Sequence, residues 1–558
     1  MLKNALIILL ASIPFAVSAQ RDKDTTTNRQ VVIEAIYKPK FMDVQKIESV
    51  PVIDKPQVKP TVFTYQIKAH QVSTEKIVNP MPVADLIVND ESVYPNSFIK
   101  LGYGNIRTPL AEIYLNNKQN KKYSYGAHYR FLQTNSNLNN SFADFSNHNF
   151  KGYASTFTEN SELGIDVNYR QNKFYYYGFD TSSKKLEKTT DNLSRTINTF
   201  DARAYFNSTA SSKKKLKHRS QFNYYNFGID KALENQYAFN TKLYGNIPNF
   251  NDLKNCQLSA VLGIDYNTFK WDSLSSIKRL FIQIDPRFEF EYEGLQITAG
   301  FNTSIFINGK DSAVPYFNPV IKVNYPLIEG VANLYAGIDG RYQKQSLRNI
   351  INSNPFTSQY ELTNMYENLK SYLGINAKMG ASADAMFEIA YSDVSKMPLF
   401  VTRKDSNFAV NSFSILYTQV SLLKFSAAFN YSFSEKVRIG VLGNFYNYEI
   451  TEQAYPWQLP NLDAKMNMRF NIKNKLYPHI DIMAFGAQKQ KTIDINNKTN
   501  STSNIDAFYD ISMGIDYRFK NKLSAFVQAN NLLNNRYQRW YNYPVYGFNI
   551  IGGITMIF

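Results

Sequence analysis

Residues 506–519 decide the fold, because apolar and polar side chains alternate along the run DAFYDISMGIDYRF. One set contains Ala507, Tyr509, Ile511, Met513, Ile515, Tyr517 and Phe519, and the other contains Asp506, Asp510, Ser512, Gly514, Asp516 and Arg518. Side chains on a strand point alternately to opposite faces, so one face here is apolar and the other is polar. A helical period would scatter both sets around a cylinder, so the run is predicted to be a β-strand.

The same two-residue alternation recurs in the runs 162–170, 282–291 and 461–472. Several of these runs reach ten residues or more, whereas strands of ordinary globular domains average about five or six. Ten residues is the length of a tilted strand that crosses a membrane. An array of soluble sandwiches also alternates, but strand length and an export signal favour a membrane barrel.

The composition excludes several other classes of protein. The 558 residues include 40 Tyr and 40 Phe, which is too much aromatic content for a disordered chain. A single cysteine, Cys256, excludes a disulfide framework and a cysteine-based zinc site. Beyond residue 20 no run of about 18 apolar residues occurs, so the sequence predicts no helical membrane span.

The first 96 residues differ from the rest. Residues 1–19 have the form of a signal peptide, with Lys3, an apolar core Ala5–Val17 and the small-residue site Val17-Ser18-Ala19. Residues 20–96 carry seven prolines, which oppose long helices and central strands, so we expect an extended arm in the periplasm or the barrel lumen. A disordered tail is the alternative for this segment.

Residues 97–558 are predicted to form an all-β fold, a transmembrane antiparallel β-barrel of about 22 strands. Short turns alternate with longer polar loops, near 173–196, 343–366, 397–420 and 532–545 among others, as in barrels with tight periplasmic turns and long outer loops. The apolar faces must then contact lipid and the charged faces the lumen, since a lipid-facing Arg or Lys costs roughly 2–4 kcal/mol near the midplane. The lumen residues expected to shape selectivity are Arg170, Arg287, Glu289, Lys465, Arg469, Asp516 and Arg518.

The last 55 residues carry the sharpest motif. Phe548, Ile550, Gly552, Ile554, Met556 and Phe558 share one face, and Asn530-Asn531-Leu532-Leu533-Asn534 precedes an aromatic loop. This arrangement resembles the end of a TonB-dependent receptor. The resemblance implies an outer-membrane location, contact with outer-membrane lipid and the barrel assembly machinery, and solute uptake. It makes Ile550, Ile554, Met556 and Phe558 the expected assembly signal.

The other end departs from that family, whose members carry a folded plug of well over a hundred residues. Only about 75 residues precede the barrel here, so the resemblance does not secure TonB-driven transport. The run Val31-Val32-Ile33-Glu34-Ala35 is a candidate for pairing, as an added strand, with TonB. A strand packed in the lumen or at the barrel edge is the alternative interpretation.

Motifs for catalysis are absent from the sequence. No two of the five histidines are three to five residues apart, and neither a Gly-x-Ser-x-Gly elbow nor a Walker-type loop occurs. We therefore expect no enzyme activity, no metal and no cofactor. The basic run of Lys213-Lys214-Lys215, Lys217, His218 and Arg219 falls in an expected periplasmic turn, so nucleic acid is not an expected partner. A solvated turn is expected there, and contact with anionic lipid headgroups is the alternative.

The function predicted from the sequence is uptake or passage of an unidentified solute across the outer membrane, in the manner of a receptor or porin. A barrel that serves as a structural or assembly subunit, without transport, is the alternative. Trp540, Tyr541 and Tyr543 lie in an expected outer loop, where they would meet ligand or sit at the lipid interface.

Overall fold

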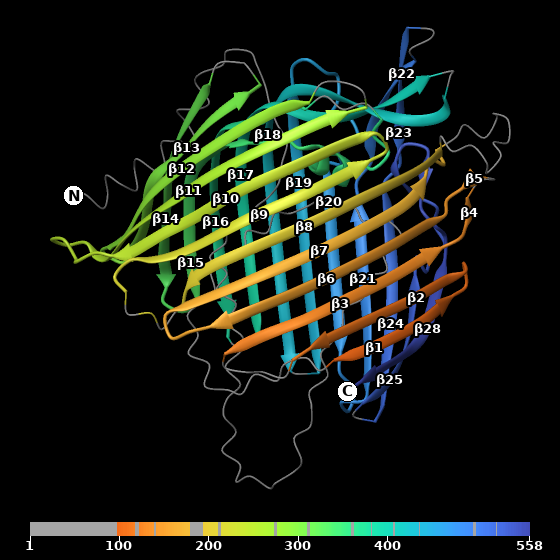
Figure 1. Cartoon of the computed structure of the whole chain (residues 1–558), viewed down its shortest axis with the longest axis horizontal. Helices are drawn as coiled ribbons and strands as arrows, with labels where there is room; N and C mark the ends of the chain where they lie inside the picture. Colours follow the sequence, from red (N-terminus) through yellow and green to blue (C-terminus); the bar gives the residue numbers. More distant parts are fainter. Residues whose placement is uncertain are drawn as a thin grey trace.

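The structure is a computed structural model of the whole chain (Figure 1). It describes residues 97–558, apart from the gaps 118–121, 139–140, 179–192, 210–211, 213, 273–275, 310–312, 359–361, 381, 406–407, 435, 495–497 and 521. The expected signal peptide and arm, including Val31–Ala35, lie outside the described residues. No helix within the described residues has the length and apolar character needed to cross a membrane.

The described chain forms a closed barrel of 22 antiparallel strands, which confirms the predicted fold class. The barrel strands are β1 (Phe98–Gly104), β2 (Thr108–Asn116), β3 (Tyr123–Thr134), β6 (Phe145–Phe157), β7 (Ser161–Tyr175), β8 (Ser194–Ser208), β9 (Lys217–Ile229), β10 (Ala232–Asn246), β11 (Lys254–Trp271), β12 (Ile277–Tyr292), β13 (Leu295–Asn308), β14 (Val314–Ile328), β15 (Ala332–Gln343), β16 (Met365–Met379), β17 (Ala383–Asp405), β18 (Phe408–Ser434), β19 (Val437–Ile450), β20 (Leu462–Phe470), β21 (Leu476–Phe485), β24 (Phe508–Lys520), β25 (Leu523–Asn530) and β28 (Asn549–Ile557).

The barrel closes where its last strand pairs with its first. β28 pairs with β25 on one side and with β1 on the other, from Phe98 opposite Ile557 to Gly104 opposite Ile551. Backbone groups in hydrocarbon have no water to bond, so a membrane-spanning sheet must close in this way. Most turns at the rim where β28 ends are short, and since tight turns face the periplasm in outer-membrane barrels, we assign it as the periplasmic rim. The opposite, outer rim carries the longer loops and two small hairpins, β4 (Asn137–Leu138) with β5 (Ser141–Phe142) and β26 (Gln538–Trp540) with β27 (Tyr543–Pro544).

The two faces of β24 follow the sequence alternation. In β24, Tyr509, Met513, Ile515 and Tyr517 are 39–57 % exposed on the outer face, whereas Asp510 is 7 % exposed on the lumen face. The face of β24 that the sequence marks as apolar is therefore the face available to lipid.

One predicted loop is wrong. Residues 397–420 were expected to form a polar loop, but β17 continues to Asp405 and β18 begins at Phe408. Both strands rise past the outer rim, and the hairpin of β22 (Gln488–Asp494) and β23 (Thr499–Ile505) adds to β17 through the parallel pair Thr402–Thr492 (Figure 1). The cause is apolar packing, since Met397, Leu399, Val401, Val420 and Trp457 form a cluster that is at most 3 % exposed.

Several lumen-facing glycines let a ring on the next strand lie flat against the wall. Tyr335 of β15 covers Gly374 of β16, and its hydroxyl donates to Glu388 Oε2 at 3.1 Å. Tyr205 covers Gly164 in the same way, and Tyr153 covers Gly126. Flat rings occupy little of the lumen, so this pairing keeps the interior wide.

We expect Gly374→Ala to lower the free energy of unfolding by about 1–3 kcal/mol, because an added methyl group would overlap the Tyr335 ring and separate its hydroxyl from Glu388. Urea unfolding in detergent micelles measures the change. Gly443→Ala is the matched control, since a methyl group there meets no atom within 4 Å. Equal stability of the two variants would contradict the packing argument.

Candidate functional site

The barrel encloses a cavity of about 1770 Å³ between the lumen-facing strands and the outer loops. Its wall is formed by inward side chains of strands from β6 to β28, and loop residues such as Lys344, Arg348 and Trp540 also line it. This volume exceeds the roughly 300–1,000 Å³ typical of small-molecule pockets. The cavity is therefore the candidate functional site.

Aromatic side chains from five separate outer segments pack together at the mouth of the barrel, beside the cavity. We call this cluster the outer cap; its buried members are Ala143, Tyr177, Ile350, Phe356, Phe400, Phe413, Trp540, Tyr543 and Tyr546. The Tyr546 hydroxyl donates to the carbonyl of Ala143, which ties the last loop to the loop between β3 and β6. The cap thus joins loops that are hundreds of residues apart.

Tyr543 is the centre of the outer cap. It is 0 % exposed, stacks on Phe356 with ring centroids 3.7 Å apart, and meets Tyr177 edge-on at 5.0 Å. Burial among these rings raises the pKa of the Tyr543 hydroxyl well above its usual value. Tyr543 is therefore a neutral packing residue at physiological pH.

The inner loop, residues 344–358, contains the short helix α2 (Leu347–Ser353) and contributes Ile350 and Phe356 to the outer cap. Ser346 caps the helix by accepting a hydrogen bond from the Asn349 N–H at 3.0 Å. Leu347 and Ile351 are at most 1 % exposed and pack on Phe227 and Phe269 of the barrel wall. The inner loop therefore folds into the barrel and covers one side of the cavity.

Buried arginines of the barrel wall hold the inner loop in place. Arg195 of β8 is 1 % exposed, and its Nη1 donates to the carbonyls of Pro355 at 2.7 Å and Thr357 at 2.6 Å. Its Nη2 lies 2.6 Å from Asp230 Oδ2, which balances the charge. Hydrogen bonds from a charged donor are stronger than neutral ones, so this residue is a firm anchor.

A second anchor joins three strands to the same loop. Arg279 Nη2 lies 3.1 Å from Glu234 Oε1, and Asn267 donates to the same oxygen at 2.8 Å. Arg279 Nη1 donates to the carbonyl of Gln345 at 2.8 Å, and the Arg348 N–H donates to Glu234 Oε2 at 3.1 Å. Arg279 and Glu234 are at most 2 % exposed, so this ion pair is screened from water.

Charged groups of the inner loop also contact the wall. Lys344 Nζ lies 2.6 Å from Asp265 Oδ2, and Arg348 pairs with Asp201. Burial lowers the pKa of Lys344, although Asp265 beside it acts in the opposite direction. These ion pairs add to the contacts that hold the inner loop on the barrel wall.

The cavity wall carries charges of both signs. Eleven lysines and arginines line it, namely Lys151, Arg203, Arg287, Lys322, Arg341, Lys344, Arg348, Lys370, Lys424, Lys465 and Arg539. Nine carboxylates line it, namely Asp166, Asp201, Asp265, Asp285, Asp339, Glu367, Asp463, Asp481 and Asp510. Together with many Asn, Gln, Tyr and Ser side chains, these groups suit a hydrophilic solute.

The lumen residues predicted from the sequence are placed as follows. Arg287 and Lys465 line the cavity, and Arg469 pairs at 2.8 Å with Asp481, which also lines it. The other four lie on the lumen face outside the cavity: Arg170 opposite Thr199, Glu289 opposite Gln257, Asp516 opposite Phe526, and Arg518 with its guanidinium 5.3 Å from the Tyr477 ring centroid. Their role in selectivity stays a prediction.

The three outer-loop candidates have different environments. Trp540 is 6 % exposed and lines the cavity, while Tyr543 is fully buried in the outer cap. Tyr541 is half-buried, with its hydroxyl 3.4 Å from Ser503 Oγ. Contact of these residues with ligand stays a prediction, for which the structure makes Trp540 the candidate that borders the cavity.

Several residues of the site were not singled out by sequence reasoning. Asp201, Glu234 and Asp265 alternate with outward apolar residues, so the alternation rule could have found them. Their partners Lys344 and Arg348 lie in a loop without alternation of apolar and polar residues, so the same rule could not have found them. Among the described residues no group of three or more His, Cys, Asp or Glu side chains could hold a metal ion.

These features define a class of protein, a closed 22-stranded membrane barrel whose outer loops fold over a polar lumen. No protein-family model matches the chain, and no curated protein matches it.

Solved structures of TonB-dependent receptors share the fold. They include the FrpB iron transporter from Neisseria meningitidis (TM-score 0.65, 11 % identity, 83 % of this chain and 81 % of that chain covered). The ferric-catecholate import receptor Fiu from K12 E. coli matches with TM-score 0.63 and 8 % identity, covering 83 % of this chain and 82 % of that chain. The siderophore receptor PirA from Acinetobacter baumannii matches with TM-score 0.64 and 10 % identity, covering 83 % and 80 %. At these identities the likeness shows the fold.

Proposed function

We propose that the protein takes up a hydrophilic solute across the outer membrane, as a receptor-like barrel. The observation that carries this proposal is the cavity of about 1770 Å³ within a closed barrel, lined by charged side chains of both signs and bordered by loops that pack inward. The fold that the chain shares with an iron transporter and a ferric-catecholate import receptor supports it.

The geometry suggests how a solute would pass. The outer cap and the inner loop both lie beside the cavity at the outer end of the barrel, and we propose that both move when a large solute enters. Inside, paired charges and amides offer donors and acceptors to a solute that loses its hydration shell. Selectivity would then depend on Arg287 and Lys465, which line the cavity, and on the other predicted lumen residues.

Conductance in planar bilayers tests the proposal. We expect the full chain to conduct little, and a variant without residues 21–95 that also carries Tyr543→Ala to conduct ions. If no variant forms a channel and cells without the protein take up every tested solute normally, the transport proposal fails. That result would favour a structural or assembly subunit.

Energy coupling is a separate part of the proposal. We propose that Val31–Ala35 pairs with TonB, since an extended apolar run can add to an exposed sheet edge. Uptake that stops both in cells without TonB and in a variant lacking residues 31–35 would support this contact. Uptake that continues in both would identify a passive pore.

We also propose that the outer face of β28 directs assembly. Ile550, Ile554, Met556 and Phe558 are 37–52 % exposed on one face, and the Phe558 N–H donates to the Ser97 carbonyl at 2.9 Å. We expect Phe558→Ala to reduce the folded barrel in the outer membrane several-fold, measured as the heat-modifiable band on a gel. Phe433→Ala is the control, at an aromatic of β18 that is even more exposed (69 % against 49 % for Phe558), and it should assemble normally.

A further inference from the structure

On strands β6 to β12, the face of the barrel that points away from the lumen becomes polar near the outer rim. His148, Gln171 and Asn198 lie directly opposite one another on β6, β7 and β8. Gln171 Nε2 donates to Asn198 Oδ1 at 2.9 Å. These residues occupy the same face as Phe150 and Phe200, which are 43 % and 38 % exposed, so they point away from the lumen.

A second row continues this surface across the next four strands. Asn226, Asn235, Thr268 and Lys278 are successive register partners on β9, β10, β11 and β12. Asn226 Nδ2 donates to Asn235 Oδ1 at 2.8 Å. We call the two rows, together with Lys173 and Lys270 on the same face, the polar patch.

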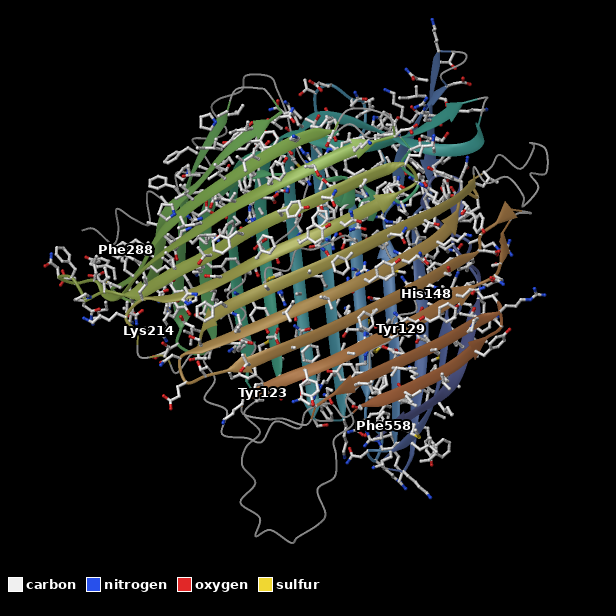
Figure 2. All side chains as sticks on the ribbon, viewed as in Figure 1. Tyr123, Tyr129, His148, Lys214, Phe288 and Phe558 are labelled. Carbon is white, nitrogen blue, oxygen red and sulfur yellow. The ribbon has the colours of Figure 1, made fainter. Side chains whose placement is uncertain are left out.

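Tyrosines mark the depth of the polar patch. Tyr129, Tyr169 and Tyr224 extend their hydroxyls toward it, to His148 Nδ1 at 3.0 Å, Asn198 Oδ1 at 3.3 Å and Asn235 Oδ1 at 3.3 Å (Figure 2 labels the first pair). Tyr224 and Tyr237 continue this belt with centroids 5.0 Å apart. Aromatic belts lie at the membrane–water interface, so the patch is at the level of the lipid headgroups.

The charged side chains of the polar patch are all positive. Lys173, Lys270 and Lys278 are exposed on it, and the described residues of this face add no carboxylate. The acids in the turns above already have partners, with Asp230 Oδ2 2.6 Å from Arg195 Nη2 and Asp272 Oδ2 3.1 Å from Lys231 Nζ. By contrast, the outer face of β17 and β19 carries Asp393 and Glu449.

We propose that the polar patch binds the phosphorylated sugar headgroup of a glycolipid in the outer leaflet. The lysines provide ammonium groups for phosphates, and the amide ladder provides donors and acceptors for sugar hydroxyls. The acyl chains would lie on the apolar face below, where Phe222, Phe239 and Ile264 are 46–52 % exposed. This site is outside the lumen, so it does not depend on the proposed uptake function.

Binding of bisphosphorylated lipid A to the full chain in detergent tests the proposal, with native mass spectrometry as the readout. Each lysine near an anionic headgroup contributes roughly 1 kcal/mol, so K173Q/K270Q/K278Q should weaken binding roughly 100-fold. The matched control is K436Q/K473Q/K522Q, which removes three exposed charges from periplasmic turns and should change binding less than twofold. Heat-modifiable gel mobility verifies that each variant is folded.

A second comparison separates sugar recognition from charge alone. We expect N198L/N235L to weaken binding of lipid A at least fivefold while phosphatidylglycerol binding stays unchanged. We also expect dephosphorylated lipid A to bind the lysine variant and the unmodified chain equally well. Equal loss for lipid A and phosphatidylglycerol would overturn the glycolipid assignment. Lipid A binding that the lysine variant leaves unchanged would overturn the proposal. A dimer of the wild-type chain that the lysine variant dissociates would also overturn it, and would identify this face as a protein interface.

Discussion

Arg279→Met should lower the free energy of unfolding by about 3–5 kcal/mol, because it breaks a buried ion pair. Glu234 is 0 % exposed and lies 3.1 Å from the Arg279 guanidinium, so removal of the arginine leaves a buried carboxylate without its counter-ion. Urea unfolding in detergent micelles, followed by circular dichroism, measures the loss. A change below about 1 kcal/mol would show that the pair is not the anchor that the geometry indicates.

The double variant Glu234→Gln with Arg279→Met is the control for this prediction. It removes both charges together, and such replacements of buried ion pairs are often neutral or stabilising. We therefore expect the double variant to be more stable than Arg279→Met alone. Both variants lose the bond from Arg279 Nη1 to the Gln345 carbonyl, so both should show faster proteolysis in residues 344–358.

Tyr543→Ala should open the outer cap while it leaves the barrel strands intact. The side chain fills the centre of a cluster formed by several loops, and truncation of a buried aromatic costs about 3–5 kcal/mol. Since each 1.4 kcal/mol is a factor of ten, amide exchange in residues 531–548 should accelerate at least roughly 100-fold. Exchange in β24 and β25 should remain slow.

The matched control for the cap is Tyr541→Ala, two residues away in the same loop. Tyr541 is half-buried and its hydroxyl has a 3.4 Å contact with Ser503, so its loss should barely change exchange. If both variants opened the loop equally, the loop would be loosely held and Tyr543 would not be its anchor. If Tyr543→Ala opened the loop but left solute access unchanged, the cap would not be the entrance barrier of the proposed uptake route.

The strand pattern made the barrel predictable from local sequence. Alternation in 506–519 identified β24 and assigned Tyr509 and Met513 to the outer face, and the same rule placed Arg287 and Lys465 on the lumen face. The rule failed at 397–420, where polar residues suggested a loop. There, apolar residues such as Leu399 and Val401 continue the strands above the rim because Trp457 covers them.

The site was less predictable because its closing elements are held by distant partners. Arg195 binds the carbonyl of Thr357, 162 positions away, and the Arg348 N–H binds Glu234, 114 positions away. Neither residue stands out in the sequence, where each is one of 62 lysines and arginines. In a loop, no alternation in the sequence tells which way a side chain points. The partner of a loop residue is therefore known only from the tertiary structure.

The sequence by itself therefore determined the fold class, the strand count of about 22 and the two faces of strands that alternate throughout, such as β24. These properties are local, since a two-residue period and the cost of charge in lipid assign every side chain of a strand. Only the tertiary structure decided that the inner loop and the outer cap fold into the mouth, and that tyrosines and amides align along β6 to β12. Those arrangements depend on packing and ion pairs between segments far apart in the chain, and no short stretch of sequence contains both partners.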